Sequence, residues 1–231
     1  MRFFSCPVTP MRALMPLLLA VACATSIPAV QAAPPAIKPL QIGTLRIGEG
    51  MPKTIVPITA ATAEQALQQA TVIAASASTD IAEWRIDYLD IATDGTALLA
   101  LGKRIEQALA GKPLIVTFRT QAEGGSKAIS DADYGALYAT LLRGGFVQML
   151  DVEMFRDRQV VQSLVDAAHG AGAKVVMSSH DFHATPPREE IVARLLRQQA
   201  MGADVLKIAV MPRDAGDVLA LLDATWQVRQ Q

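Results

Sequence analysis

The sequence predicts an α/β fold of the (β/α)8 TIM-barrel type, preceded by an N-terminal hairpin and apparently truncated after the sixth strand–helix unit. Short β-rich apolar segments alternate with helical segments, an order that favours a parallel sheet joined by right-handed crossovers. Polar residues stand at the ends of the strands, as the mouth of a barrel requires. The first strand lacks the glycine-rich phosphate loop that an open nucleotide-binding sheet would favour.

The chain is predicted to fall into three segments: a secretory signal peptide over residues 1–32, a Pro/Ala-rich spacer over 33–40 and an incomplete barrel catalytic domain over 41–231. The leader has a positive charge at Arg12, an apolar run too short to be a persuasive membrane span, and small residues before a cleavage point at Ala32. We therefore expect a periplasmic or secreted protein, with no membrane contact in its mature form.

Two details of the leader stay open. Either Met1 or Met11 could be the start, because the residues before Met11 add little to a signal. A lipoprotein cleavage box ending at Cys23 is an alternative, but it lacks the leucine usual at its first position, so anchoring there is less favoured. Both cysteines, Cys6 and Cys23, lie in the leader, so cleavage would leave a chain without disulfides, cysteine–zinc sites or cysteine nucleophiles.

The composition is that of an ordinary globular domain, with 51% hydrophobic residues, 21 basic residues and 22 acidic residues. The charge is nearly balanced and no basic stripe is present, so binding to nucleic acid would release almost no counterions. Nucleic acid is therefore not expected as a partner.

The barrel domain is expected to begin with a hairpin over residues 42–47 that turns at 48–50. The expected strands then span residues 54–58, 81–88, 114–118, 147–152, 173–178 and 205–210. The expected helices span residues 63–75, 98–110, 131–143, 158–169, 187–201 and 214–229.

Residues with strong local preferences justify these bounds. Thr62 is a favourable N-cap for the first helix, and Gly111 and Gly170 stand where the second and fourth helices should end. The strands are short β-rich apolar runs, interrupted in the first by Pro57 and followed in the last by Pro212.

Side-chain alternation along the strands separates charged residues from apolar ones. In strand 81–88 the charged face is Glu83, Arg85 and Asp87, and the face expected to pack on helices is Trp84, Ile86 and Tyr88. The residues that share the inward parity on later strands are Thr117, Arg119, Ser178, His180, Val205 and Lys207. Six parallel strands should not close a standard barrel, so two unpaired edges are expected.

Lys207 is the residue that most clearly indicates a catalytic function. It lies within the apolar run 205–210, which is expected to be buried on both faces, where a cation must be paired, neutralised or catalytic. A lysine whose amine is neutral can attack a carbonyl and form a Schiff base. The alternative is a lysine near a strand end that extends to solvent.

The loop after strand 114–118 contains Arg119 and Glu123, next to glycines. A surface ion pair is the alternative interpretation of these two residues. Asp151 and Glu153 line the mouth or close a polar network, and we assign them no catalytic role.

Two histidines follow strand 173–178. His180 shares the inward parity and could transfer a proton in both directions near neutral pH. A metal site formed by His180 and His183 is the alternative, although no third ligand with suitable spacing stands out.

Together these segments resemble type I 3-dehydroquinate dehydratase, the Schiff-base-forming enzyme of shikimate and quinate metabolism, along nearly the whole mature chain. The matching motifs are Glu83-Trp-Arg-Ile-Asp87, Phe118-Arg-Thr with Glu123-Gly-Gly125, Met177-Ser-Ser-His-Asp-Phe-His183 with Thr185-Pro186, and Lys207-Ile-Ala-Val-Met-Pro212. Each motif alone is weak, but their order and spacing together are specific.

The resemblance implies a lyase that converts 3-dehydroquinate, a small-molecule substrate, to 3-dehydroshikimate by syn elimination of water, with no metal or diffusible cofactor. It implies a Schiff-base lysine, a general base and acid, and a carboxylate that orients the latter: Lys207, His180 and Glu123. The substrate-binding positions that it implies are Glu83, Arg85 and Arg119. The two arginines are also expected to favour a neutral Lys207 through their positive potential.

The chain departs from the family pattern in two ways. Pro57 stands where the family usually has a serine that contacts substrate. The family's last two strand–helix units are not found, and with them the arginine that binds the substrate carboxylate and the lid loop. Losing that arginine could lower the rate on the order of 10²-fold.

These departures leave alternatives open. One is a catalytically impaired member of the family that at most binds quinate-like acids, and a more distant one is another Schiff-base lyase such as a class I aldolase. The predicted export favours quinate catabolism over aromatic amino-acid biosynthesis. A homodimer is compatible with the exposed barrel edges.

Overall fold

The computed structural model describes residues 39–231, so the predicted leader and nearly all of the predicted spacer lie outside the described residues. The elements in chain order are β1 (Leu40–Ile42), β2 (Leu45–Ile47), β3 (Ile55–Ile58), α1 (Ala63–Ala75), β4 (Ile81–Arg85), η1 (Ile86–Tyr88), α2 (Gly95–Ala108), β5 (Leu114–Thr117), η2 (Gln121–Glu123), α3 (Asp131–Leu142), β6 (Met149–Glu153), α4 (Arg158–Gly170), β7 (Lys174–Asp181), α5 (Arg188–Ala200), β8 (Val205–Val210) and α6 (Ala215–Arg229).

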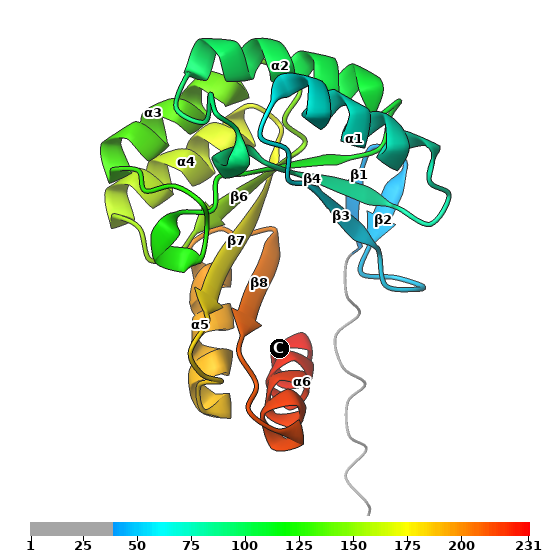
Figure 1. Ribbon diagram of the computed structural model, residues 1–231. Coiled ribbons are helices and arrows are strands. Elements are labelled where there is room, and N and C mark those ends of the chain that lie inside the picture. Colours follow the sequence, from blue (N-terminus) through cyan, green and yellow to red (C-terminus); the bar gives the residue numbers. More distant parts are fainter. Residues whose placement is uncertain (1–38) are drawn as a thin grey trace, which may run out of the picture. The chain divides into compact units, whose positions relative to one another are not determined.

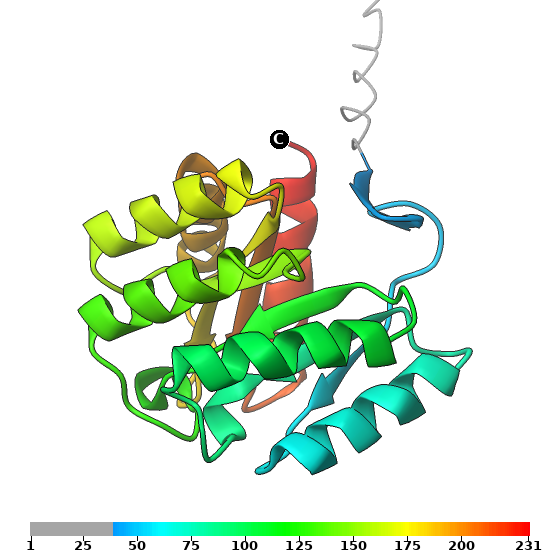
Figure 2. The same ribbon diagram turned by 90° about the horizontal axis from the view of Figure 1, so that it is seen from above.

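Strands β3 to β8 form one curved parallel sheet in which strands that follow each other in the sequence are also neighbours in space (Figure 1). Helices α1 to α4 cover one face of this sheet, as both views show (Figures 1 and 2). Helices α5 and α6 pack against each other and contact Leu206 and Ile208 of β8. Within residues 39–231 the sheet has six strands and does not close into a ring, since β3 and β8 are its edges. The predicted alternation of six strands and six helices is confirmed.

The two faces of the sheet bury different kinds of residue. The face toward the helices contributes the main core, which includes Trp84, Val116, Leu150 and Met177. On the inward face, the first residues of the strands are apolar and contact the β1–β2 hairpin, with Ile42 packed among Ile81, Ile115, Met149 and Val176. The hairpin therefore covers the amino-terminal end of the inward face and leaves the carboxyl-terminal end to polar residues.

The hairpin turn and the start of α2 differ from the prediction because local turn and capping geometry overrides the apolar pattern. The hairpin is confirmed, but its turn lies at Gly43 and Thr44 rather than at 48–50: Ile42 pairs with Leu45, and Gly43 supplies the required φ of 56°. Helix α2 begins at Gly95 because Asp94 caps it, with Oδ1 accepting from the backbone nitrogens of Thr96 and Ala97.

Strand β4 is shorter than predicted, and β7 is longer. β4 ends at Arg85, and residues 86–88 form a short 3-10 helix that turns Tyr88 away from the sheet, so this ring stacks under the Arg85 guanidinium instead of packing on helices. β7 continues to Asp181, so His180 lies within a strand and not after it.

Helix α2 is held close to the core by a glycine. The ring of Phe146 lies 6.4 Å from that of Trp84, and a Cβ added at Gly102 would lie 2.2 Å from the Phe146 Cζ atom. Since that distance is far below van der Waals contact, only glycine allows the helix to approach the ring.

We predict that Gly102→Ala lowers the free energy of unfolding by about 1–3 kcal/mol through overpacking, even though alanine is the better helix former by about 1 kcal/mol. The matched control is Gly170→Ala in α4, where no atom lies within 4 Å of the new Cβ, so stability should be equal or higher. Urea denaturation of both variants checks this prediction, and equal stabilities would contradict it.

Candidate active site

Charged side chains gather on the inward face near the carboxyl ends of the strands, as the alternation predicted. The residues of this cluster are Glu83, Arg119, Asp151, Glu153, Ser178, His180 and Lys207, together with Glu123 from η2. The parallel register keeps their parity from strand to strand: Thr117 pairs with Asp151, and Ser178 with Lys207. The structure thus brings the predicted catalytic residues to one end of the sheet.

Lys207 lies on β8 with its amine between two carboxylates. Its Nζ atom is 3.0 Å from Oδ2 of Asp151 and 3.5 Å from Oε1 of Glu83. The side chain is 35% exposed, so the prediction of a lysine buried on both faces of its strand is wrong. It has instead an open approach on one side and fixed anions on the other.

Gln198 holds the backbone of Lys207 from the outer side. Its Oε1 atom accepts from the Lys207 nitrogen at 3.1 Å, and its Nε2 atom donates to the Lys207 carbonyl at 2.9 Å. Because β8 is an edge strand in the described residues, this buried amide from α5 takes the place of a neighbouring strand. The amide therefore fixes the register position of Lys207.

Asp151 connects Lys207 to the rest of the cluster. Its Oδ1 atom accepts from Nη2 of Arg119 at 2.7 Å and from Oγ of Ser178 at 2.6 Å, while its Oδ2 atom faces Lys207. Burial alone would raise the pKa of Asp151, but Arg119 and Lys207 hold this pKa well below its ordinary value. Asp151 is therefore a fixed anion within a polar network, as one of the two expected roles stated, but its contact with Lys207 was not predicted.

Arg119 is almost fully buried among carboxylates. Its guanidinium contacts Asp151, Glu153 at 2.9 Å and Glu123 at 3.6 Å. Burial would lower the pKa of Arg119, but Asp151 and Glu153 raise it above its ordinary value. Burial raises the pKa of Glu153, the reverse of the shift at Asp151, although both carboxylates face Arg119.

Arg85 and Arg119 were expected to favour a neutral Lys207 through their positive potential, but the arrangement of charges in the structure differs from this expectation. Arg119 is paired with carboxylates, and Arg85 forms a bidentate pair with Asp87, with both hydrogen bonds at 2.8 Å. The charged groups that contact Nζ of Lys207 are anions rather than guanidiniums. The assignment of Glu83, Arg85 and Arg119 to substrate binding stays a prediction.

His180 and Glu123 form the second pair of the site. Nδ1 of His180 is 2.8 Å from Oε2 of Glu123, and the Phe182 ring stacks against the imidazole at a centroid distance of 6.1 Å. Ser178 pairs with Lys207, and His180 lies two residues farther along the same face, or about 6.6 Å along the strand. With Nδ1 engaged, Nε2 is the nitrogen left for proton transfer.

The loop that positions Glu123 requires its glycines. Gly124 has a φ of 79°, and a Cβ at Gly125 would lie 1.8 Å from the Arg119 carbonyl oxygen. Asp87 ties this loop to β4, because its carboxylate accepts from Arg85 and from the backbone nitrogens of Arg119 and Ser126. The Asp87 carboxylate therefore fixes Arg85 and the Glu123 loop together.

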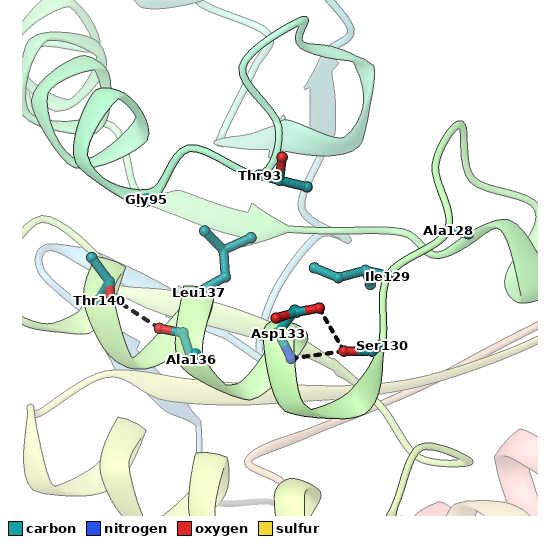
Figure 3. A pocket seen from close by; sticks show the side chains of 9 residues that line it. All are labelled: Thr93, Gly95, Ala128, Ile129, Ser130, Asp133, Ala136, Leu137 and Thr140. Carbon is teal, nitrogen blue, oxygen red and sulfur yellow. Dashed lines mark hydrogen bonds between the residues drawn. The ribbon is translucent and has the colours of Figure 1, made fainter.

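A separate groove of about 880 Å³ lies on the outer surface beside the beginning of α3 (Figure 3). Three of its polar side chains are engaged within α3 and its cap: Ser130 donates to Asp133 and caps the helix, and Thr140 donates to the Ala136 carbonyl. None of the cluster residues lines this groove. It offers no converging reactive groups.

Two further findings concern residues 39–231. No group of three or more His, Cys, Asp or Glu side chains in this part of the chain is arranged to hold a metal ion. None of its helices is long and apolar enough to cross a membrane. The predicted signal peptide lies outside these residues.

Comparison with known proteins identifies close relatives. Residues 54–231 match the family described as Type I 3-dehydroquinase. The chain is 50% identical over 190 residues to the "Catabolic 3-dehydroquinate dehydratase" of Acinetobacter baylyi, covering 82% of this chain and 70% of that one. It is 46% identical over 189 residues to the 3-dehydroquinate dehydratase of Enterococcus faecalis, covering 82% and 74%.

Solved structures agree with the sequence matches. The 3-dehydroquinate dehydratase of Enterococcus faecalis superimposes with a TM-score of 0.80 at 45% identity, covering 82% of this chain and 79% of that one. The type I enzyme of Clostridium difficile, solved with covalently modified comenic acid, gives a TM-score of 0.79 at 38% identity, covering 81% and 74%. The predicted fold class is confirmed.

We predict that acid destabilises the chain partly through Asp151. Because its folded-state pKa lies below the ordinary value of 3.8, its ionisation stabilises the fold above about pH 4, and this stabilisation is lost as the pH falls below 3.8. The free energy of unfolding should therefore fall more steeply between about pH 4 and about pH 2 in the wild type than in Asp151→Asn. Urea denaturation across this range measures both slopes, and parallel curves would contradict the prediction.

Proposed function

The chain belongs to the type I 3-dehydroquinase family, a family of hydro-lyases, and we propose that it removes water from 3-dehydroquinate through an imine formed on Lys207. The observation that supports this most is the placement of an approachable lysine and a carboxylate-bound histidine on the same face of adjacent strands. The proposed product, 3-dehydroshikimate, and the syn course of the elimination are those that the family resemblance implies.

Lys207 supplies the nucleophile. Its nitrogen attacks the ring ketone, the carbonyl oxygen leaves as water, and a protonated imine remains. The positive nitrogen withdraws electrons from the ring, so a proton on the neighbouring carbon becomes easier to remove. The Clostridium difficile relative was solved with covalently modified comenic acid, which supports a covalent step.

His180 transfers the protons. Nε2 removes the proton from the carbon next to the imine, and the electron pair moves to the imine nitrogen to give a neutral enamine. As the electrons return, the β-hydroxyl leaves with the proton from His180 as water, and the protonated imine forms again. Glu123, 2.8 Å from Nδ1, orients the ring and stabilises its charged form. Hydrolysis then releases the product and Lys207.

Glu83, Arg85 and Arg119 are proposed to bind the ring hydroxyls. The Glu83 side chain is 15% exposed, and its Oε1 atom is fixed by the hydroxyl of Thr117 at 2.9 Å. Pro57 of β3 pairs with Glu83 in the sheet and has neither a hydroxyl nor a backbone donor to offer there. Substrate binding therefore depends on β4 and β5 more than on β3.

We predict that Lys207→Ala and His180→Ala separate the two steps. Treatment with 3-dehydroquinate and borohydride should add a stable mass to Lys207 in the wild type, and Lys207→Ala should gain no adduct. His180→Ala should still form the adduct while turnover falls by about 10²–10⁴-fold, because only proton transfer is lost.

Intact-mass and peptide mass spectrometry measure the adduct, and absorbance of the conjugated product measures turnover. An unmodified Lys207 in folded wild-type protein would exclude the imine mechanism. An adduct without measurable turnover in the wild type would instead favour the alternative of a family member that only binds quinate-like acids.

We propose, from the leader sequence, that the protein is exported and acts in quinate catabolism. The name of the Acinetobacter baylyi relative, "Catabolic 3-dehydroquinate dehydratase", supports the catabolic assignment. We predict a mature protein that begins at Ala33 and is recovered from the periplasm or the medium. N-terminal peptide mass spectrometry of cell fractions tests this, and an uncleaved leader on a purely cytoplasmic protein would contradict it.

A further inference from the structure

We propose that Asp151 is the counter-ion of the protonated imine on Lys207: a fixed carboxylate that keeps the positive charge on this nitrogen throughout the reaction. The proposal rests on the imine mechanism above and extends it to a residue that this mechanism does not otherwise use. It assigns Asp151 as a group in contact with the reacting nitrogen.

Charge is conserved at the nitrogen during condensation. The ammonium form of Lys207 and a ketone together yield a protonated imine and one water molecule, so no net proton enters or leaves. The new nitrogen still has one N–H group and one positive charge. An anion placed to contact the ammonium is therefore also placed to contact the imine.

The two carboxylate oxygens of Asp151 have different hydrogen-bond partners. Oδ1 is held by Arg119, which follows β5, at 2.7 Å and by Ser178 of β7 at 2.6 Å, and these two strands flank β6. Within residues 39–231, the hydrogen bond of Oδ2 is with Nζ of Lys207, at 3.0 Å. The carboxylate is therefore oriented by one oxygen and directs the other to the reacting nitrogen.

Glu83 is less suited to this task. Its oxygen lies 3.5 Å from Nζ, and its side chain is 15% exposed, whereas Asp151 is nearer and has no exposed surface. Water and salt screen Glu83 more than Asp151. Glu83 is left free to contact the substrate, which agrees with its proposed binding role.

Arg119 limits the strength of the counter-ion. In the enamine the nitrogen is neutral, so an unshared carboxylate beside it would resist the electron movement that forms the enamine. Asp151 shares its charge with Arg119, which also contacts Glu153, so the anion remains compensated in both states. The pair can thus stabilise the imine without preventing the next step.

The test is cyanoborohydride trapping of the 3-dehydroquinate adduct as a function of pH, because this reagent reduces the protonated imine selectively. The variants are Asp151→Asn, which removes the charge, Asp151→Glu, which restores it, and Glu153→Gln. The last is the matched control, since Glu153 contacts Arg119 at 2.9 Å but is not among the contacts of Lys207 Nζ. Circular dichroism verifies that each variant is folded.

We expect the pH at which trapping is half-maximal to fall by about 1–3 units in Asp151→Asn, the range typical of losing an opposite charge at this distance. Asp151→Glu should return the midpoint toward the wild-type value, and Glu153→Gln should leave it within about half a unit. A folded Asp151→Asn with an unchanged midpoint, or an equal shift in Glu153→Gln, would overturn the proposal while the imine mechanism stands.

If Asp151→Asn does not fold, Ser178→Ala tests the counter-ion role of Asp151 in its place. It removes one of the two donors that orient the carboxylate and keeps the charge, so the midpoint should fall by about half a unit or more. An unchanged midpoint would overturn the proposal. Absence of any adduct in the wild type would overturn the imine mechanism and, with it, the counter-ion.

Discussion

The ion pair between Asp151 and Arg119 is the constraint on which the rest of the site depends. Two charges removed from water are costly unless good geometry and further hydrogen bonds compensate them. Here Ser178, Glu153 and Lys207 supply those partners, and together with Asp151 and Arg119 they span β5 to β8. Removal of either Asp151 or Arg119 would break this central pair, so the position of Lys207 is coupled to residues on or next to four strands.

Along the inward face of the sheet, apolar packing residues lie at the amino ends of the strands, and the polar residues of the site lie farther toward the carboxyl ends. At the amino ends of the strands, Ile115 and Met149 contact the hairpin residue Ile42 in an apolar cluster. Two residues farther along the same strands and face, Thr117 and Asp151 pair with each other and belong to the polar network. The alternation of strand side chains keeps both sets on one face, so the site lies directly above its own apolar support.

The sequence was sufficient for the fold and for the residues with recognisable motifs, but not for contacts that form only in three dimensions. The bounds of α1 and β8 agree with the prediction, because Thr62 and Pro212 are strong local signals. Lys207, His180 and Glu123 were predicted from motifs, and the structure places them together. Asp151 and Gln198 were missed as partners of Lys207, since their roles depend on strand register and on a helix packing against an edge strand. The expected burial of Lys207 was wrong. Its strand is apolar, but it lies at the edge of the described sheet, and an apolar run in the sequence does not show whether a strand is central or at an edge.

The register between β7 and β8 has a chemical consequence. Ser178 and His180 lie two residues apart on β7 and contact different groups: Ser178 donates to Asp151, and His180, the proposed proton-transfer group, contacts Glu123. A slip of one residue between the strands would turn Lys207 to the helix-covered face and separate it from both. β7 and β8 remain paired from Val176 to Asp181, well past Lys207, and Gln198 fixes the other side of the Lys207 backbone. The extra length of β7, which the apolar pattern did not predict, therefore holds the proposed nucleophile Lys207, its anion Asp151 and His180 in one register.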